Sequence, residues 1–100
     1  MAWQKDFLVE EKPHMDGTWG GTHRVYSFPN GYGASVIPEY KELTTKDGRY
    51  RRAPIKGCWE VAVLFQDELC YTTPLTDDVI RRLNDPEVDD ILIKIRNLNS

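Results

Sequence analysis

The stretch that most constrains the fold is GCWEVAVLFQ, residues 57–66. Alternate positions of a β-strand share one face of the sheet. Here the odd-numbered positions on one face are large and apolar: Trp59, Val61, Val63 and Phe65. Ala62 and Leu64 would lie on the opposite face, which is therefore apolar as well. A strand with two apolar faces is typical of the interior of a sheet, so the sequence predicts a central strand here.

A hairpin is predicted around FPNGYGASVI, residues 28–37. The preceding THRVYSF, which begins at Thr22, is rich in β-branched and aromatic residues. Asn30-Gly31 is typical of a type I′ turn, because both residues accept positive φ, although the following Tyr-Gly pair indicates a longer or bulged loop. ASVI would be the returning strand, and Pro38 would end it.

The next segment, residues 39–56, shows no sustained period of 2 or 3.6 residues and is predicted to be a long exposed loop. It leaves room for a short hairpin about Asp47-Gly48. After the central strand, QDE would turn the chain and LCYTT would pair back, ending at Pro74. The N-terminal segment around Phe7 could add an edge strand.

Two helices are predicted near the C-terminus. Thr76 is placed to cap a helix that starts near Asp77, and Asp85 is placed to cap a second one with Pro86 in its first position. The second helix has one apolar face at helical spacing, made of Val88, Ile91, Leu92, Ile95 and Leu98. The short link between the two favours an αα-hairpin laid on the sheet.

These segments predict an α+β fold with a single domain over residues 1–100. A four- or five-stranded antiparallel meander would occupy residues 22–73, with the basic loop 39–56 inside it. A two-helix hairpin over residues 76–98 would pack on one face of the sheet. Two helices cover only one side, so the second apolar face of the central strand would be covered by the N-terminal segment, by the long loop or by another chain. Such a face is the strongest hint of a partner or a homodimer.

Charge and composition narrow the functional classes. The net charge is −3, which provides no overall attraction to nucleic acid or anionic lipid. The longest aliphatic and aromatic run is VAVLF, and the N-terminus does not resemble a signal peptide, so a cytoplasmic protein without a membrane segment is expected. Cys58 and Cys70 are read as reduced thiols, although a disulfide between neighbouring strands is conceivable.

The basic loop is the best candidate for a functional site. Six of the thirteen Lys and Arg residues lie within residues 41–56, opposed there by Glu42 and Asp47. Such a loop can be a solvated surface, or it can bind phosphate groups or a carboxylate-rich protein surface. We predict that the contacts are made by Arg49, Tyr50, Arg51, Arg52 and Lys56, and by Tyr32 at the hairpin turn.

The other candidate sites have simpler structural readings. The acids of the helical segment could imitate DNA phosphates, but most occupy caps or first turns. DGTWGGTH, residues 16–23, matches no phosphate-binding pattern. His14, His23, Cys58 and Cys70 lack the close pairing of a structural zinc site. No nucleophile elbow or raised-pKa carboxylate pair is recognisable, so no metal, no cofactor and no enzymatic activity are predicted.

The blocks FPNGYGASVI, WEVAVL and TPLTDDVI resemble, in order and spacing, a group of short proteins encoded by tailed bacteriophages and prophages. The resemblance runs from about Arg24 to the C-terminus and carries no catalytic signature. It implies a phage accessory protein that acts by binding, and so modulating or inhibiting, a host or phage protein. Nucleic-acid binding through residues 41–56 is the alternative.

Overall fold

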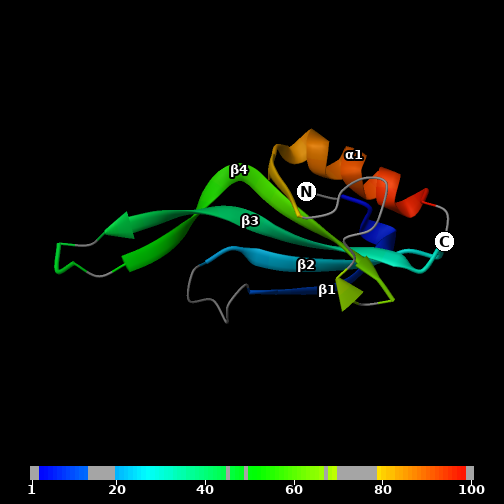
Figure 1. Cartoon of the computed structure of the whole chain (residues 1–100), viewed down its shortest axis with the longest axis horizontal. Helices are drawn as coiled ribbons and strands as arrows, with labels where there is room; N and C mark the ends of the chain where they lie inside the picture. The colour runs from blue at the N-terminus through cyan, green and yellow to red at the C-terminus, as the bar shows by residue number, and fades with distance from the viewer. Residues whose placement is uncertain are drawn as a thin grey trace.

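A computed structural model describes residues 3–13, 20–44, 46–48, 50–66, 68–69 and 79–98, and at 50–51 and 68–69 it describes the backbone. In chain order the elements are a 3-10 turn (Lys5–Phe7), β1 (Leu8–Pro13), β2 (Thr22–Ser27), β3 (Tyr32–Thr44), β4 (Tyr50–Phe65), β5 (Glu68–Leu69), β6 (Ile80–Leu83) and α1 (Asp85–Arg96). Helix α1 lies over one face of the sheet, and the far ends of β3 and β4 project beyond the other strands (Figure 1).

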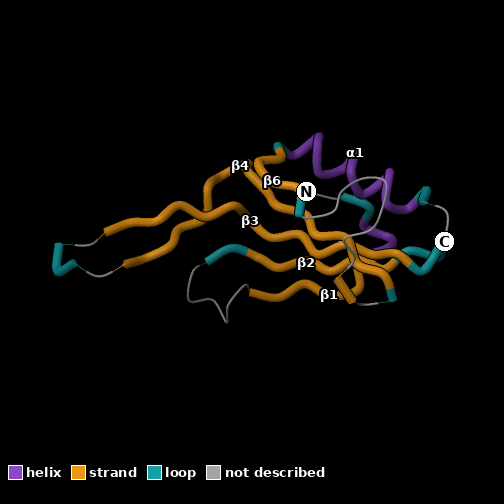
Figure 2. Tube along the Cα trace, in the orientation of Figure 1, coloured by secondary structure: helices purple, strands orange, loops and turns teal. Residues whose placement is uncertain are grey.

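The sheet is an antiparallel meander. Five strands pair in chain order, β1-β2-β3-β4-β5, which confirms the predicted α+β class with an antiparallel sheet. β1 is the edge strand that the N-terminal segment could add. The strand predicted at LCYTT, residues 69–73, begins one residue earlier, because β5 is Glu68–Leu69, and residues 70–73 lie outside the described residues. A sixth strand, β6, lies alongside β4 (Figure 2).

The predicted two-helix hairpin is wrong, because the described residues contain one C-terminal helix, α1. Ile80–Leu83, expected within a first helix starting near Asp77, form β6, while residues 70–78 lie outside the described part. A helix shorter than about 12 residues is marginal in water. The edge of β4 offers these residues backbone partners, and Leu83 is buried there. Pairing with the sheet therefore overrides the local helix signals.

Helix α1 starts one residue earlier than predicted. Its N-cap is Asn84 rather than Asp85: the Asn84 side chain accepts a hydrogen bond from the Glu87 N–H at 2.9 Å. The Glu87 carboxylate accepts one from the Asn84 N–H at 3.0 Å. This reciprocal pair is a capping box, and it satisfies two N–H groups at the start of the helix. The predicted apolar face is confirmed, with Val88, Leu92 and Ile95 fully buried.

The core lies between α1, the N-terminal turn and one face of the sheet. Its buried residues are Trp3, Tyr26, Phe28, Ala34, Val36, Val61, Val63, Leu83, Val88, Leu92 and Ile95. On the opposite face of β4, Ala62 and Leu64 are half-buried. Helix α1 thus covers one of the two apolar faces of the central strand, and a homodimer through the other face stays a prediction.

Most of the loop predicted at 39–56 is a hairpin instead. β3 continues through Pro38 to Thr44, and β4 begins at Tyr50, with Tyr40 opposite Pro54 and Thr44 opposite Tyr50. The recorded pairing of β2 with β3 ends at Val36, so a proline two residues later removes no ladder bond on that side. We call residues 40–44, 46–48 and 50–54 the arm. The predicted turn at Asp47-Gly48 is confirmed at its tip, where Gly48 has φ 80°.

The β2–β3 turn does more than reverse the chain. Gly31 has φ 89° and its N–H bonds to the Phe28 carbonyl at 3.2 Å, whereas Asn30 has no positive φ, so the turn is not type I′. The Asn30 side-chain amide lies 3.0, 2.9 and 2.9 Å from the carbonyl oxygens of Ile95, Arg96 and Leu98. These carbonyls close α1. The turn is therefore the C-terminal cap of the helix.

Candidate binding arm

The predicted contact residues separate into two places. Tyr50, Arg51 and Arg52 lie on the β4 strand of the arm, and Arg49 lies outside the described residues. Lys56 follows the arm and is exposed. Tyr32 is not with them: it starts β3 at the other end of the sheet, half-buried, with its ring centre 4.8 Å from that of Phe65. The structure therefore groups the residues of the basic segment and separates Tyr32 from them.

The arm has two different faces. Glu42 and Arg52 are opposite each other, and their side chains form an exposed ion pair at 3.7 Å. The next pairs on either side, Lys41 with Ala53 and Leu43 with Arg51, belong to the other face, because faces alternate along a strand. Lys41, Leu43 and Ala53 therefore lie on the face of the arm opposite to that of Glu42 and Arg52. The contacts assigned from sequence to Arg51 and Arg52 stay a prediction.

Exposed apolar side chains accompany the cations. Leu43 is 42% exposed and Ile55 is 38% exposed, and the neighbouring Lys41 and Lys56 are exposed as well. These apolar residues were missed by sequence reasoning, which interpreted the segment by its charge. The available signal was one large aliphatic residue in each of two polar or charged segments, Leu43 in KELTT and Ile55 in RAPIKG. A surface of this composition can desolvate against another protein.

The charge of the chain is divided between this segment and the rest. Residues 41–56 carry six basic and two acidic side chains, a net charge of +4. The remaining residues carry seven basic and fourteen acidic side chains, a net charge of −7. A locally positive, projecting element on an otherwise acidic chain attracts acidic groups and is screened by salt.

At its base the arm is separated from the body by a bulge in β4. Pro38 is opposite Trp59 and Tyr40 is opposite Pro54, so residues 55–58 of β4 face one residue, Glu39, on β3. Gly57 within this segment has φ 74°, and a Cβ built there would meet no atom within 4 Å. We call residues 55–58 the β4 bulge. It corresponds to the arch that β4 makes in Figure 1.

A hydrogen bond braces the base of the arm. The Tyr40 hydroxyl donates to the Gly20 carbonyl at 2.6 Å, and burial raises the pKa of Tyr40, so the hydroxyl stays protonated. Gly21 adjoins the same place, where a Cβ would lie 2.7 Å from the Pro38 ring. The segment before β2 therefore holds the arm against the body.

Removing this brace should loosen the arm. Tyr40→Phe deletes the donor and leaves the Gly20 carbonyl without it, which is expected to cost about 1 kcal/mol of unfolding free energy. Chemical denaturation would measure this cost. In hydrogen exchange, amides 40–44 and 50–53 should exchange faster than in the wild type, while those of α1 should not change. Arm amides exchanging at the wild-type rate would show that the hydroxyl is not the brace.

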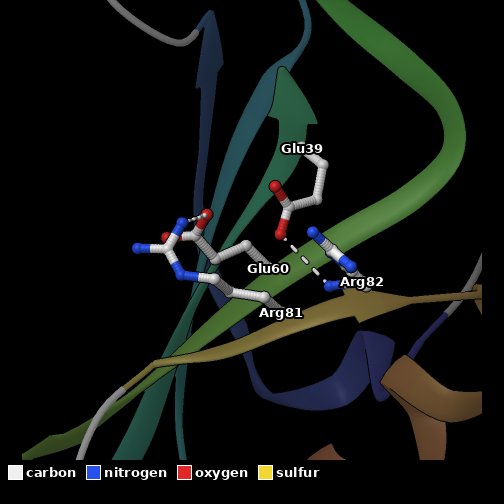
Figure 3. Close-up of polar contacts among 4 residues, drawn as sticks. All are labelled: Glu39, Glu60, Arg81 and Arg82. Atoms are coloured by element: carbon white, nitrogen blue, oxygen red, sulfur yellow. Dashed lines mark hydrogen bonds and ion pairs between the residues drawn. The ribbon is translucent and has the colours of Figure 1, made fainter. Parts of the chain in front are cut away.

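Two arginines lie where β3, β4 and β6 meet (Figure 3). The Arg82 N–H donates to the Glu39 carboxylate at 3.1 Å, and the Arg81 guanidinium lies 3.3 Å from the Glu60 carboxylate. Both arginines are exposed, and Arg82 has φ 59°. Glu39 is the residue that faces the β4 bulge, so this cluster adjoins the base of the arm.

The helix acids take part in internal contacts. Asp85 accepts from the Trp59 indole N–H at 2.6 Å, and Asp89 accepts from the Gln4 amide at 3.2 Å. Glu87 belongs to the capping box. These contacts support the structural reading of the helix acids over an imitation of DNA phosphates.

The alternative ligand sites receive no support. Within the described residues no group of three or more His, Cys, Asp or Glu side chains is placed to hold a metal ion. His23 contacts the Ser35 hydroxyl at 2.6 Å, and Cys58 is a half-buried free thiol in β4. His14, Cys70 and most of DGTWGGTH lie outside the described residues. The predictions for those residues stay predictions.

Over the part of the chain that is described, no helix has the length and apolarity needed to cross a membrane. Comparisons of the chain with protein-family models, with curated proteins and with solved structures give no match. The resemblance to phage-encoded proteins therefore stays a prediction, and the argument for function rests on the arm.

Proposed function

We propose that this chain is a non-catalytic binding protein whose arm docks on an acidic, partly apolar surface of another protein. The observation that carries the proposal is that exposed Lys41 and Leu43 lie on the arm, while exposed Ile55 and Lys56 lie in the β4 bulge that adjoins it. The cations steer and orient an acidic partner, and the apolar side chains contribute binding energy as water leaves them. The resemblance suggests a host or phage protein as the partner, which the bound arm would modulate or inhibit.

A protein partner explains more of the arm than a nucleic acid does. Sugar-phosphate backbones bind Lys and Arg, but they offer little to an exposed Leu43 that is 42% accessible. An extended protein segment that carries carboxylates and apolar side chains complements both kinds of residue. The net charge of −7 outside residues 41–56 would also oppose a long polyanion more than a short acidic segment.

The test is Leu43→Asp, measured by fluorescence anisotropy with a labelled twelve-residue peptide of alternating glutamate and leucine as the probe. Leu43→Asp places a negative charge on the contact face and should weaken binding by about tenfold or more, equivalent to about 1.4 kcal/mol. Val9→Asp is the matched control, because Val9 is 64% exposed on β1, away from the arm. It should bind the probe like the wild type.

Two results would contradict the proposal. One is wild-type protein that binds the glutamate peptide no tighter than a matched peptide of alternating lysine and leucine. The other is an equal loss of binding in Leu43→Asp and Val9→Asp, which would mean that the arm is not the contact surface.

Nucleic-acid binding is the second candidate, favoured by the shape of the arm. A two-stranded β-ribbon fits the major groove of DNA, and residues 41–56 carry a net charge of +4. A labelled 20-base-pair duplex in the same assay tests it. If the chain bound the duplex with an affinity that falls steeply with salt, and did not bind the acidic peptide, nucleic-acid binding would be the function supported.

A further inference from the structure

Strand β6 contains a bulge. Leu83 is opposite Trp59 and Ile80 is opposite Val61, so Arg81 and Arg82 of β6 together face the single residue Glu60 of β4. An extra residue in one strand bends it and changes the direction of nearby side chains, and such bulges recur beside functional sites. The bulge carries two consecutive exposed arginines, and in Figure 3 Arg81 extends toward Glu60 whereas Arg82 lies on the side of Glu39.

The bulge holds Arg82 in a conformation that its side chain disfavours. Arg82 has φ 59°, within the left-handed region where a Cβ crowds the following carbonyl. Glycine, or next asparagine, is the residue expected at such a position. An arginine that keeps this backbone is therefore strained in a way that a different residue would relieve, and strain of this kind tends to occur at functional positions.

One carboxylate holds the backbone of Arg82, and a second one pairs with the side chain of the neighbouring Arg81. Glu39 accepts from the Arg82 N–H at 3.1 Å, and Glu60 pairs with Arg81 at 3.3 Å. Both acids are half-buried or better, while the Arg82 side chain is exposed. Within the described residues, the polar contact of Arg82 is the one that its backbone N–H makes with Glu39. The fold thus uses the backbone of Arg82 and leaves its guanidinium available to a ligand.

The position of Arg82 continues the surface of the arm. Glu39 joins Arg82 to β3 at the residue that faces the β4 bulge, where the exposed Ile55 and Lys56 lie. A partner segment lying along the arm toward the body would arrive at this junction. A guanidinium there can bind a carboxylate through two parallel hydrogen bonds, which a lysine cannot do.

We propose that Arg82 is a second contact residue, which binds a carboxylate of the same acidic protein segment that docks on the arm. This inference rests on the proposed function and names a further residue of its surface. The β6 bulge maintains the strained arginine because its guanidinium serves binding, and the residue adds nothing to folding that glycine would not add.

The test uses Arg82→Gly in the full chain with the glutamate–leucine peptide as the probe. Glycine accepts positive φ, so the melting temperature should stay the same or rise. Binding of the peptide should weaken by about tenfold. Arg82→Lys keeps the positive charge but lacks the planar guanidinium, so its affinity for the peptide should lie between those of the wild type and Arg82→Gly. Arg82→Asn, which also tolerates this backbone, should behave like Arg82→Gly.

Unchanged peptide binding in Arg82→Gly would overturn the inference. So would a lower melting temperature in both Arg82→Gly and Arg82→Asn, because Arg82 would then be structural. The proposed function fails separately: its failure is a wild-type protein that does not bind the peptide, or a Leu43→Asp variant that binds it normally. If Leu43→Asp weakened peptide binding and Arg82→Gly did not, the arm would remain the proposed contact surface and Arg82 would not be part of it.

Discussion

Alanine at Gly33 is expected to lower the free energy of unfolding by about 3 kcal/mol, the upper part of the range for overpacked sites. A Cβ added there would lie 2.3 Å from the Tyr26 carbonyl oxygen, which is backbone and cannot rotate away. Gly33 is opposite Ser27 of β2 and Leu64 of β4, so the clash would separate strands at the middle of the sheet. The melting temperature should fall by roughly 15 °C for a domain of this size.

Gly48→Ala is the control for this prediction. Gly48 has φ 80° in the turn of the arm, but an added Cβ would meet no atom within 4 Å. Its cost should be limited to the backbone strain of about 1 kcal/mol. Thermal unfolding of both variants checks the ranking. If Gly48→Ala were the more destabilised of the two, the close approach at Gly33 would not be the constraint.

The second large effect is expected for Asn30→Asp, which should cost about 2 kcal/mol of unfolding free energy. The substitution preserves size but removes the amide hydrogens that reach the carbonyls of Ile95, Arg96 and Leu98. It also places a negative charge at the C-terminal end of α1, where the helix dipole is negative. Denaturant unfolding, followed by the circular dichroism of the helix, measures the loss.

The pH dependence of the unfolding free energy separates the loss of the amide hydrogen bonds from the effect of the negative charge at the helix end. The new carboxyl is disfavoured as an anion beside the helix end, so its pKa in the folded state should lie above the unfolded value of about 3.9. The charge penalty should therefore be present at neutral pH and shrink as the pH falls through the raised folded-state pKa toward the unfolded value. Asn30→Ala loses the donors without adding a charge, so its deficit should not shrink in the same way. Identical pH profiles for the two variants would contradict the dipole argument.

Much of the fold could be predicted because its signals are local. The β-branched and aromatic residues of THRVYSF predicted β2, and the apolar faces of GCWEVAVLFQ predicted the body of β4. The acids and proline near residue 85 predicted the start of α1 to within one residue. The Asp47-Gly48 turn was predicted for the same reason, since positive φ at Gly48 is a property of the residue itself. These elements follow from side-chain periodicity and backbone preference.

The errors occurred where a distant partner decides the conformation. Ile80–Leu83 have the residues of a short helix, but the edge of β4 takes them as a strand. Pro38 was expected to end its strand, because a proline cannot donate a hydrogen bond to a neighbouring strand. β3 nevertheless continues through Pro38, because its pairing with β2 has already ended at Val36. Local sequence contains no information on either neighbour.

The candidate site shows the same division. Tyr50, Arg51, Arg52 and Lys56 come together in the structure because they are close in the chain. Tyr32 was assigned to the same surface and lies elsewhere, packed on Phe65. The exposed Leu43 and the strained Arg82 were not found, because exposure and φ at these positions depend on the arm and on the β6 bulge.

The sequence by itself determined the strand-forming character of β2 and of the body of β4, a capped helix near residue 85 and the concentration of positive charge in residues 41–56, because each depends on neighbouring residues. Only the tertiary structure decided that this charge lies on a projecting ribbon with two distinct faces. It also decided that Asn30 caps a helix 65 residues away. The reason is that strand pairing, capping across the chain and solvent exposure are set by contacts between residues far apart in sequence.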